Sequence, residues 1–229
     1  MIKIFLLFLA PLLLGTITSR NSIKRNNNRL HRESTNLAEP ILKALTNRIA
    51  KSLGLDEIPI SIHEVKTFNG LATSDGKIFL TRGALDAFYK GDVTAEELSS
   101  IIAHELGHVA LGHSKRRMID FSMQNALRII LSLTIGRLVP AIGTYIASFL
   151  TSLVAAKLSR NDEYEADAYA AAILAKSGIG THAQISLLRK LDFLAKDGGT
   201  MPQWLMSHPK TRDRIIAIEE LTREWTSSN

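Results

Sequence analysis

The sequence predicts an α+β fold that is mainly α, with a small β-sheet. Apolar residues recur at helical spacing through most of the second half of the chain, while two short runs rich in β-branched residues lie in the first half. A chain of 229 residues with 45% hydrophobic residues is long enough to bury one substantial core. We therefore expect one principal domain over residues 36–229, preceded by a terminal segment and a linker.

Residues 1–19 form the terminal segment. A basic start is followed by an apolar stretch from Ile4 to Leu14, which is short for a membrane span and typical of a signal peptide. No A-x-A cleavage site follows, and the next charges are basic, which favours an uncleaved anchor that keeps the chain on the cytoplasmic side. The sequence thus predicts an exported, periplasmic or membrane-associated protein and leaves a cytoplasmic-facing anchor open.

Residues 20–35 are predicted to be a basic polar linker. No aromatic residues are interleaved with its basic side chains, so the net charge of +6 does not predict nucleic-acid binding. We expect this segment to face solvent or lipid headgroups. Its basic residues are Arg20, Lys24, Arg25, Arg29 and Arg32.

The first half of the domain combines helices and strands. Residues 41–54 show helical spacing and end at Gly54. The runs at 58–65 and 77–81 predict strands, with a turn at 74–76 before the second. Thr94 and Glu97 form a capping box, which predicts the start of a helix.

The second half is predicted to be helical throughout. Thr181 and Gln184 indicate another capped helix start. The expected helices cover residues 117–134, 139–158, 160–177, 181–196 and 210–222.

The stretch IIAHELGHVALGHSK, at 101–115, predicts a zinc site on the capped helix. His104 and His108 are four positions apart, which places them about 40° from each other on one helix face, so both can bind one metal ion. Glu105 is then placed to act as a general base on water. Because the chain has no cysteine, any further ligand must be His, Asp or Glu.

Two segments are candidates for the third ligand. His113 lies five positions after His108, about 140° around the helix, so it is not expected to be a ligand and fits a helix end after Gly112. Glu163 and Asp167 lie four apart on another predicted helix and share a face. We expect Glu163 to bind zinc and Asp167 to accept the other imidazole N–H of His104. An exposed acidic helix start is the alternative.

The combination of HELGH at 104–108, EYEAD at 163–167 and SHPKTRDRI at 207–215 resembles a family of zinc metallopeptidases. This family includes the CAAX prenyl proteases, the HtpX-like heat-shock proteases, a mitochondrial inner-membrane stress protease and a periplasmic protease of outer-membrane assembly. The segment FNGLATSDGKIFLTRGAL at 68–85 is also similar, although Gly70 stands where many relatives carry Ala. The resemblance covers about residues 40–222 and implies a gluzincin-like fold, one zinc ion per chain and hydrolysis of peptide bonds within proteins.

The resemblance also raises a role for His208. Above the zinc it either donates to the oxyanion of the transition state or, as in some relatives, binds the metal reversibly in a latent state. The alternative is a plain N-terminal cap before Pro209.

The second strand is a candidate substrate-binding element. As a sheet edge it would pair with an extended polypeptide, and the alternative is an ordinary core strand. Its residues are Lys77, Ile78, Phe79, Leu80 and Thr81.

An apolar insert at 129–156 separates the two halves of the zinc motif. Residues 138–156 carry no charge, but a single membrane span there would place His104 and Glu163 on opposite sides of the membrane. Two spans need about forty apolar residues, and the 28 residues of the insert, which contain Arg137, are too few. We expect helices that contact a membrane surface, with a buried pair as the alternative. Arg128, Arg137 and Lys157 would then meet anionic headgroups.

Together these features predict a zinc-dependent endopeptidase that acts on misfolded or membrane-associated polypeptides. The alternative is a zinc-stabilised, proteolytically latent module that holds polypeptides in the manner of a chaperone. A metal-free helical protein that contacts membranes is the third possibility, and the zinc motif argues against it. Neither the natural substrate nor the oligomeric state follows from the sequence.

Overall fold

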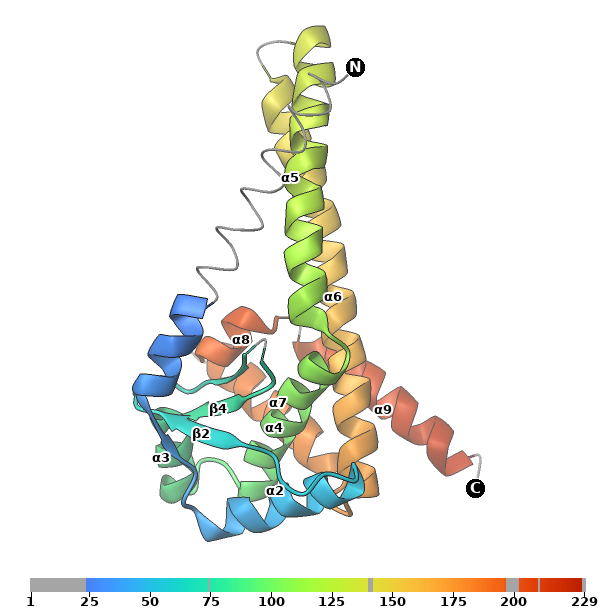
Figure 1. The fold of residues 1–229 in the computed structure, drawn as a ribbon. Coiled ribbons are helices and arrows are strands. Elements are labelled where there is room, and N and C mark those ends of the chain that lie inside the picture. Colours follow the sequence, from blue (N-terminus) through green and yellow to red (C-terminus); the bar gives the residue numbers. More distant parts are fainter. Residues whose placement is uncertain (1–23, 74, 140–141, 197–201, 210, 228–229) are drawn as a thin grey trace. The chain divides into compact units, whose positions relative to one another are not determined.

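The computed structural model describes residues 24–227, apart from Ser74, residues 140–141, residues 197–201 and Lys210 (Figure 1). The predicted signal peptide or anchor at 1–19 lies outside the described residues. The chain forms two compact units, one of residues 30–111 with 163–229 and one of residues up to 29 with 112–162. The segment 36–229 that the sequence assigns to one domain therefore spans both units.

The second half of the predicted linker is structured. Residues 24–32 are helical, and a strand follows within residues that the sequence indicated as linker. Leu30 is buried, and the Ser34 hydroxyl donates to the Leu30 carbonyl over 2.6 Å. The buried side chain of Leu30 thus holds this otherwise polar segment against the core.

The sheet of the larger unit has four strands in the order β1-β2-β4-β3. The central pair, β2 and β4, is parallel, and each outer strand runs antiparallel to its neighbour. Their bounds are Ser34–Asn36 for β1, Ile60–His63 for β2, Gly70–Ala72 for β3 and Ile78–Thr81 for β4. This confirms the predicted class, a mainly helical α+β fold with a small sheet.

The prediction that residues 77–81 form a sheet edge is wrong. β4 pairs with β2 on one side and β3 on the other, and all four of its residues are buried. The apolar run Ile78, Phe79 and Leu80 lacks the polar alternation of a half-exposed strand, which is typical of a strand covered on both faces. Lys77 precedes the strand. Among the described residues the edges are the three-residue strands β1 and β3.

After the linker the helices follow the predicted order with three differences, because α3 (Arg82–Lys90) and α8 (Gln203–Ser207) were not predicted and two predicted helices are joined. The unpredicted α3 is capped by the Thr81 side chain, which accepts from the Ala84 N–H, and it ends at Gly91 with a φ of 81°. The predicted helices 139–158 and 160–177 form a single helix, α6, because neither glycine nor proline interrupts it after Gly143. The bounds are Pro40–Ser52 for α2, Arg82–Lys90 for α3, Ala95–Ala110 for α4, Gly143–Lys176 for α6, His182–Lys196 for α7, Gln203–Ser207 for α8 and Thr211–Ser227 for α9.

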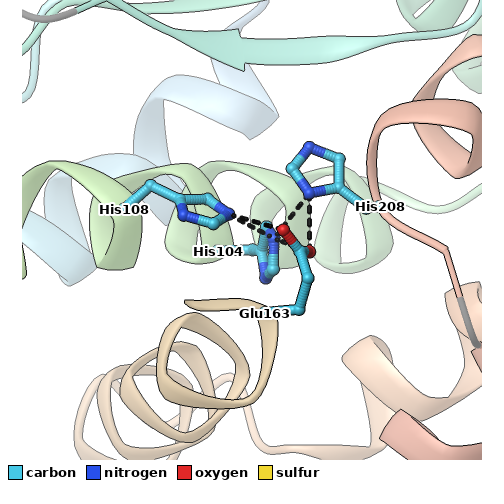
Figure 2. Close-up of side chains that lie close together, drawn as sticks. All are labelled: His104, His108, Glu163 and His208. Atoms are coloured by element: carbon cyan, nitrogen blue, oxygen red, sulfur yellow. Dashed lines mark hydrogen bonds and ion pairs between the residues drawn. The ribbon is translucent and has the colours of Figure 1, made fainter. Parts of the chain in front are cut away.

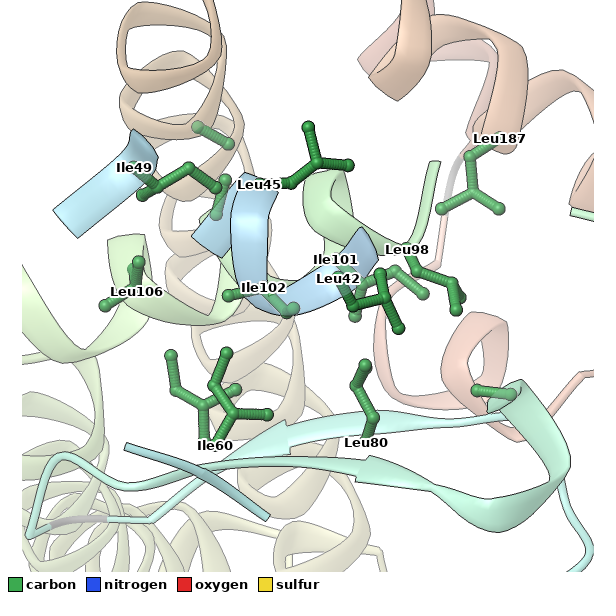
Figure 3. Packing of buried hydrophobic residues seen from close by; sticks show 14 of the residues in the cluster. Leu42, Leu45, Ile49, Ile60, Leu80, Leu98, Ile101, Ile102, Leu106 and Leu187 are labelled. Carbon is green, nitrogen blue, oxygen red and sulfur yellow. The ribbon is translucent and has the colours of Figure 1, made fainter. Parts of the chain in front are cut away.

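Helix α4 lies at the centre of the core. Every residue from Glu97 to His108 is buried, so this helix has no solvent face over that stretch. Its apolar side chains pack between α2 and the sheet, as Figure 3 shows for Ile101 and Ile102. Because α4 is surrounded by core, its polar residues are held in place by packing on all sides.

The smaller unit contains α5 (His113–Leu138) and the first part of α6, which run side by side in Figure 1. Within residues 143–157 of α6 the buried positions carry the small residues Gly143, Ala147 and Thr151. None of the described helices combines the length and the apolar character that a membrane span requires.

Candidate metal centre

Helix α4 carries the HELGH motif and begins at the predicted capping box. The Glu97 N–H donates to the Thr94 hydroxyl over 3.2 Å, and the Thr94 N–H donates to the Glu97 carboxylate over 2.8 Å. Within the motif, Gly107 lies against the backbone of Ala166 on α6, where an added Cβ would come within 2.9 Å of the Ala166 carbonyl oxygen. The glycine thus allows α6 to approach α4 closely.

This approach brings together His104, His108, Glu163 and His208 (Figure 2). All four side chains are buried, and each offers one ligand atom within 4.8 Å of the others. The Nε2 atoms of His104 and His108 are 3.1 Å apart, and a Glu163 carboxylate oxygen lies 3.4 Å from the first. His208 Nδ1 lies 2.7 Å from Glu163 Oε2 and 3.3 Å from His104 Nε2.

These side chains fit a zinc ion. Imidazole nitrogens and carboxylate oxygens are zinc ligands, and tetrahedral bonds of about 2.0–2.1 Å place neighbouring ligand atoms about 3.3 Å apart. The separations of 3.1 to 3.5 Å among His104, His108 and Glu163 agree with that value. Three of the four residues are those that the sequence indicated as ligands.

Asp167 lies where the sequence placed it, behind His104. Its Oδ1 is 2.9 Å from His104 Nδ1, so His104 Nε2 is directed towards the other ligand atoms. Burial opposes charge on His104, but hydrogen bonds to Asp167 and Glu163 raise the pKa of the imidazole to about 9. A proton and a metal ion therefore compete for Nε2 of His104.

Glu163 and Asp167 are both carboxylates in this environment. Burial opposes their ionisation, but hydrogen bonds to His104 and His208 keep the pKa of Glu163 well below its usual range. The charge of Arg214 and its hydrogen bonds do the same for the pKa of Asp167.

Arg214, on α9, was not singled out from the sequence although it lies in SHPKTRDRI. It is 1% exposed, donates to Asp167 over 2.6 and 2.8 Å, and donates to the His208 carbonyl over 3.0 Å. Its guanidinium also lies over the Trp204 ring, 5.1 Å from the centroid. One side chain thus connects Asp167 to the backbone that carries His208. The sequence offered one signal for Arg214: a charged residue at an apolar position of an amphipathic helix indicates a buried partner.

Gln184 also contacts Asp167, so the prediction that it caps a helix together with Thr181 is wrong. The Gln184 amide nitrogen donates to Asp167 Oδ1 over 3.1 Å. Its amide oxygen is buried without a hydrogen-bond partner among the described residues. The Asp167 carboxylate, with several acceptor sites, draws this side chain away from the helix terminus.

Glu105 is buried next to the four grouped side chains. Trp204 Nε1 donates to its Oε1 over 3.4 Å, and His208 Nε2 lies 3.4 Å from the same oxygen. Trp204, on α8, is 2% exposed and forms one wall of the site. The sequence offered no signal for it, because a lone tryptophan is equally common in a core.

His113 does not belong to this group, as its spacing predicted. Gly112 adopts a φ of 67° after α4 ends, but His113 begins α5 instead of closing a helix. Its ring nitrogen lies 3.9 Å from Asp162, whose carboxylate also accepts from Arg116 and Arg117.

Residues 36–222 match the sequence profile of peptidase family M48. The chain belongs to peptidase family M48. As a member of M48 it is a metalloendopeptidase, and the match includes strands β2 to β4 and the metal group.

Curated relatives named as proteases agree with this assignment. The chain is 30% identical over 177 residues to metalloprotease YcaL of Escherichia coli, which is 76% of this chain and 67% of the relative. It is 26% identical over 179 residues to metalloprotease LoiP of the same organism, covering 78% and 68%. It is 24% identical over 216 residues to protease HtpX of Alkalilimnicola ehrlichii, covering 80% and 70%.

Proposed function

We propose that this protein is a zinc-dependent endopeptidase in which His104, His108 and Glu163 bind the metal. The convergence of these three buried side chains next to Glu105 carries the proposal. Asp167 and Arg214 hold His104 in the orientation that directs its Nε2 to the metal.

The catalytic role belongs to Glu105. When bound, zinc lowers the pKa of water to about 7 and polarises the scissile carbonyl. Glu105 accepts a proton from the attacking water and donates it to the leaving nitrogen, so that one carboxylate serves as base and then as acid. Trp204 donates to Glu105 and excludes solvent from one side of the carboxylate.

His208 has a resting role in this proposal. Its Nδ1 lies among the ligand atoms, 3.3 Å from His104 Nε2, where a fourth ligand to a tetrahedral ion belongs. We assign to His208 a latent state: with zinc bound, His208 would be a fourth ligand, and a substrate would have to displace it. Donation to the oxyanion is the competing role, which has a different mutational signature.

The polypeptide substrate is proposed to pair with β3 in place of the central strand β4. The Thr73 N–H donates to the Lys77 carbonyl and the Asn69 carbonyl accepts from the Thr81 N–H. Backbone groups alternate in direction along a strand, so the N–H and C=O of Ala72 point to the outer edge. No described strand pairs with that edge. Gly70 brings β3 against α4, because an added Cβ would lie 2.2 Å from an Ile101 methyl. Main-chain pairing at Ala72 positions a substrate without demanding a sequence.

Membrane contact is proposed for the insert at 129–156. Its small residues are buried while its large apolar residues face outward, with Tyr145 at 76% and Phe149 at 62% exposure. This distribution is the reverse of a helix in water and suits a lipid surface. Arg128 and Lys157 flank the apolar part, as required for contact with anionic headgroups. We accordingly propose misfolded or membrane-associated proteins as substrates.

The test combines metal analysis with cleavage of casein by the purified protein. We expect about one zinc per chain and cleavage that stops with a chelator and returns with zinc. A preparation that binds zinc stoichiometrically yet never cleaves an unfolded protein would refute the proposed activity.

A further inference from the structure

A cavity of about 910 Å³ lies on the far side of α8 from the metal group. It is bounded by α3, α7, α8 and the segment before β3, all within the larger unit (Figure 1). Gln203 and Met206 on α8 line it, whereas Trp204 between them faces His104. None of the four grouped ligand residues contributes to its wall. The cavity is therefore separate from the metal centre and shares one helix with it.

The lining is apolar, and its rim is strongly exposed. Phe193 is 66% exposed, Leu194 49% and Met206 69%, so large apolar surfaces meet water at the cavity mouth. Clustered exposed apolar side chains are typical of a binding surface. The volume is close to the upper end of the range for ligand pockets, about 300–1,000 Å³, so it accommodates more than one apolar side chain.

The charges at the cavity argue against an anionic lipid as the occupant. Lys66 and Asp92 both line it and balance each other. The third ionic residue, Lys190, already donates to the Glu97 carboxylate over 2.9 Å and to the Asp92 carbonyl over 3.0 Å. A fatty-acid carboxylate or a phosphate would meet no net positive charge, whereas an uncharged apolar stretch of polypeptide requires none.

The cavity begins where the β3 edge ends. Phe68 lines the cavity and lies two residues before Gly70, the first residue of β3. The Phe68 carbonyl accepts from the backbone N–H of Trp204 over 3.4 Å, and this hydrogen bond joins the segment before β3 to α8. An extended chain advances about 3.3 Å per residue. A polypeptide that pairs with Ala72 therefore reaches the cavity within a few residues.

We propose that this cavity is an exosite for a cluster of apolar side chains of the polypeptide substrate, several residues from the scissile bond. The occupant follows from the proposed function, because the same polypeptide pairs with β3. Clusters of apolar side chains are buried in folded proteins and exposed in unfolded ones. The exosite thus selects unfolded polypeptides by their exposed apolar side chains. Pairing of the main chain with β3 does not distinguish these side chains.

A binding experiment tests the exosite without relying on cleavage. The probe is a fluorescein-labelled ten-residue peptide with blocked ends and three adjacent Leu and Phe residues, added to full-length Glu105→Gln protein. In this background Leu194→Glu and Met206→Glu should each raise the Kd about tenfold, because a charge enters an apolar contact. The matched control is Ile216→Glu, a 45% exposed apolar residue on α9 outside the cavity, which should keep the original Kd.

Other occupants give different results. Equal Kd values for the Leu194→Glu and Ile216→Glu proteins would overturn the proposal. Tight binding of oleate that Leu194→Glu abolishes, without any binding of the peptide, would assign the cavity to acyl chains and overturn it as well. Loss of self-association in the Leu194→Glu protein, with unchanged peptide binding, would assign it to a second copy of the chain.

Kinetics separate a failure of the exosite from a failure of the proposed activity. For each variant, KM is measured for a long unfolded substrate and for an eight-residue peptide. The ratio of the first KM to the second should be about tenfold higher in the Leu194→Glu protein than in the Ile216→Glu protein. An unchanged ratio in a cleaving enzyme refutes the exosite alone. Peptide binding that Leu194→Glu weakens, in a protein that cleaves nothing, refutes the activity alone.

Discussion

The metal group shows how neighbouring carboxylates on one site acquire different roles. Glu163 and Glu105 are both buried, but only Glu163 lies next to three imidazoles, whose nitrogens are 2.7, 3.4 and 3.5 Å from its oxygens. Glu105 meets an indole N–H and one imidazole instead. In the proposed function, the metal ligand and the general base are therefore distinguished by their partners.

Substitution of these two glutamates should separate binding from catalysis. Glu105→Gln should retain about one zinc per chain and lower the cleavage rate by about 10²- to 10⁴-fold, the usual contribution of a general base. Glu163→Gln should lose zinc, because the amide is a poor ligand without charge. Zinc per chain and casein cleavage are the two measurements. Zinc lost from the Glu105→Gln protein but kept by the Glu163→Gln protein would reverse the assignment.

His208→Ala distinguishes a latch from an oxyanion donor. Since His208 Nδ1 lies among the ligand atoms, removal of the ring should raise basal cleavage by opening the fourth position in more molecules. The measurement is the initial rate on casein with zinc content determined in parallel. A fall of about 10²- to 10³-fold with zinc retained would support the oxyanion role instead. An unchanged rate would remove His208 from the mechanism.

Arg214→Gln tests the buried ion pair behind His104. The change leaves the Asp167 carboxylate buried without its guanidinium, so the free energy of unfolding should fall by about 3–5 kcal/mol. Arg212→Gln, an exposed arginine two residues earlier on α9, is the matched control and should change it by less than about 0.5 kcal/mol. Urea denaturation measures both. Similar values for the two variants would show that Arg214 contributes no more than a surface charge.

At the scale of elements, the zinc-motif helix and the two central strands were predictable, whereas the outer strands and the strand order were not. Helix α4 has a capping box and two histidines at four-residue spacing, and both are visible as local patterns. β1 and β3 are three-residue strands, which are too short to show a periodicity of two. The central position of β4 depends on pairing with both neighbours, and such non-local contacts leave no mark in local sequence.

The candidate site was predictable to the same extent. His104, His108, Glu163 and Asp167 follow from two i, i+4 pairs on helices. Arg214 and Trp204 reach the site only because α8 and α9 fold back over it, and Gln184 leaves its expected cap for a carboxylate that the sequence does not place nearby. Arg214, Trp204 and Gln184 were therefore missed, whereas His208 was named only through the resemblance to a known family.

Gly107→Ala tests the contact of α4 with α6. The added Cβ would lie 2.9 Å from the carbonyl oxygen of Ala166 and 3.0 Å from its Cα, and backbone cannot rotate away as a side chain can. We expect a loss of about 1–3 kcal/mol in unfolding free energy. Zinc binding should weaken too, because the displaced helix carries Glu163. Calorimetric titration of zinc and urea denaturation provide the measurements.

The control for this substitution is Gly112→Ala. Gly112 has a φ of 67° and no atom within 4 Å of an added Cβ, so it tests backbone strain without a clash. Gly112→Ala should lower the free energy of unfolding by about 1 kcal/mol and leave the zinc affinity unchanged. Equal zinc affinity for both alanine variants would exclude a role of the helix contact in forming the site.

At the scale of the whole molecule, the two units divide the proposed tasks. The larger unit holds the metal group, the free β3 edge and the apolar cavity. The smaller unit has no comparable group of buried polar residues among its described positions beyond the contacts of Asp162, and it exposes most of the large apolar side chains that the structure describes. Its exposed apolar residues are Leu127, Ile129, Leu133, Val139, Ile142, Tyr145, Ile146, Phe149, Leu150, Leu153 and Val154.

If the smaller unit contacts lipid, charge placed on its exposed apolar residues should abolish membrane binding. In protein lacking residues 1–23, which removes the terminal apolar stretch, the unsubstituted chain should float with anionic liposomes and Phe149→Glu/Leu153→Glu should remain in the dense fraction. The matched control, Ile41→Glu/Leu55→Glu, adds the same charge to exposed apolar residues of the larger unit and should still float. High salt should weaken the binding only in part, because the apolar contribution is not screened. Failure of the unsubstituted chain to float would end the membrane proposal, and flotation of both glutamate pairs would move the contact away from the insert.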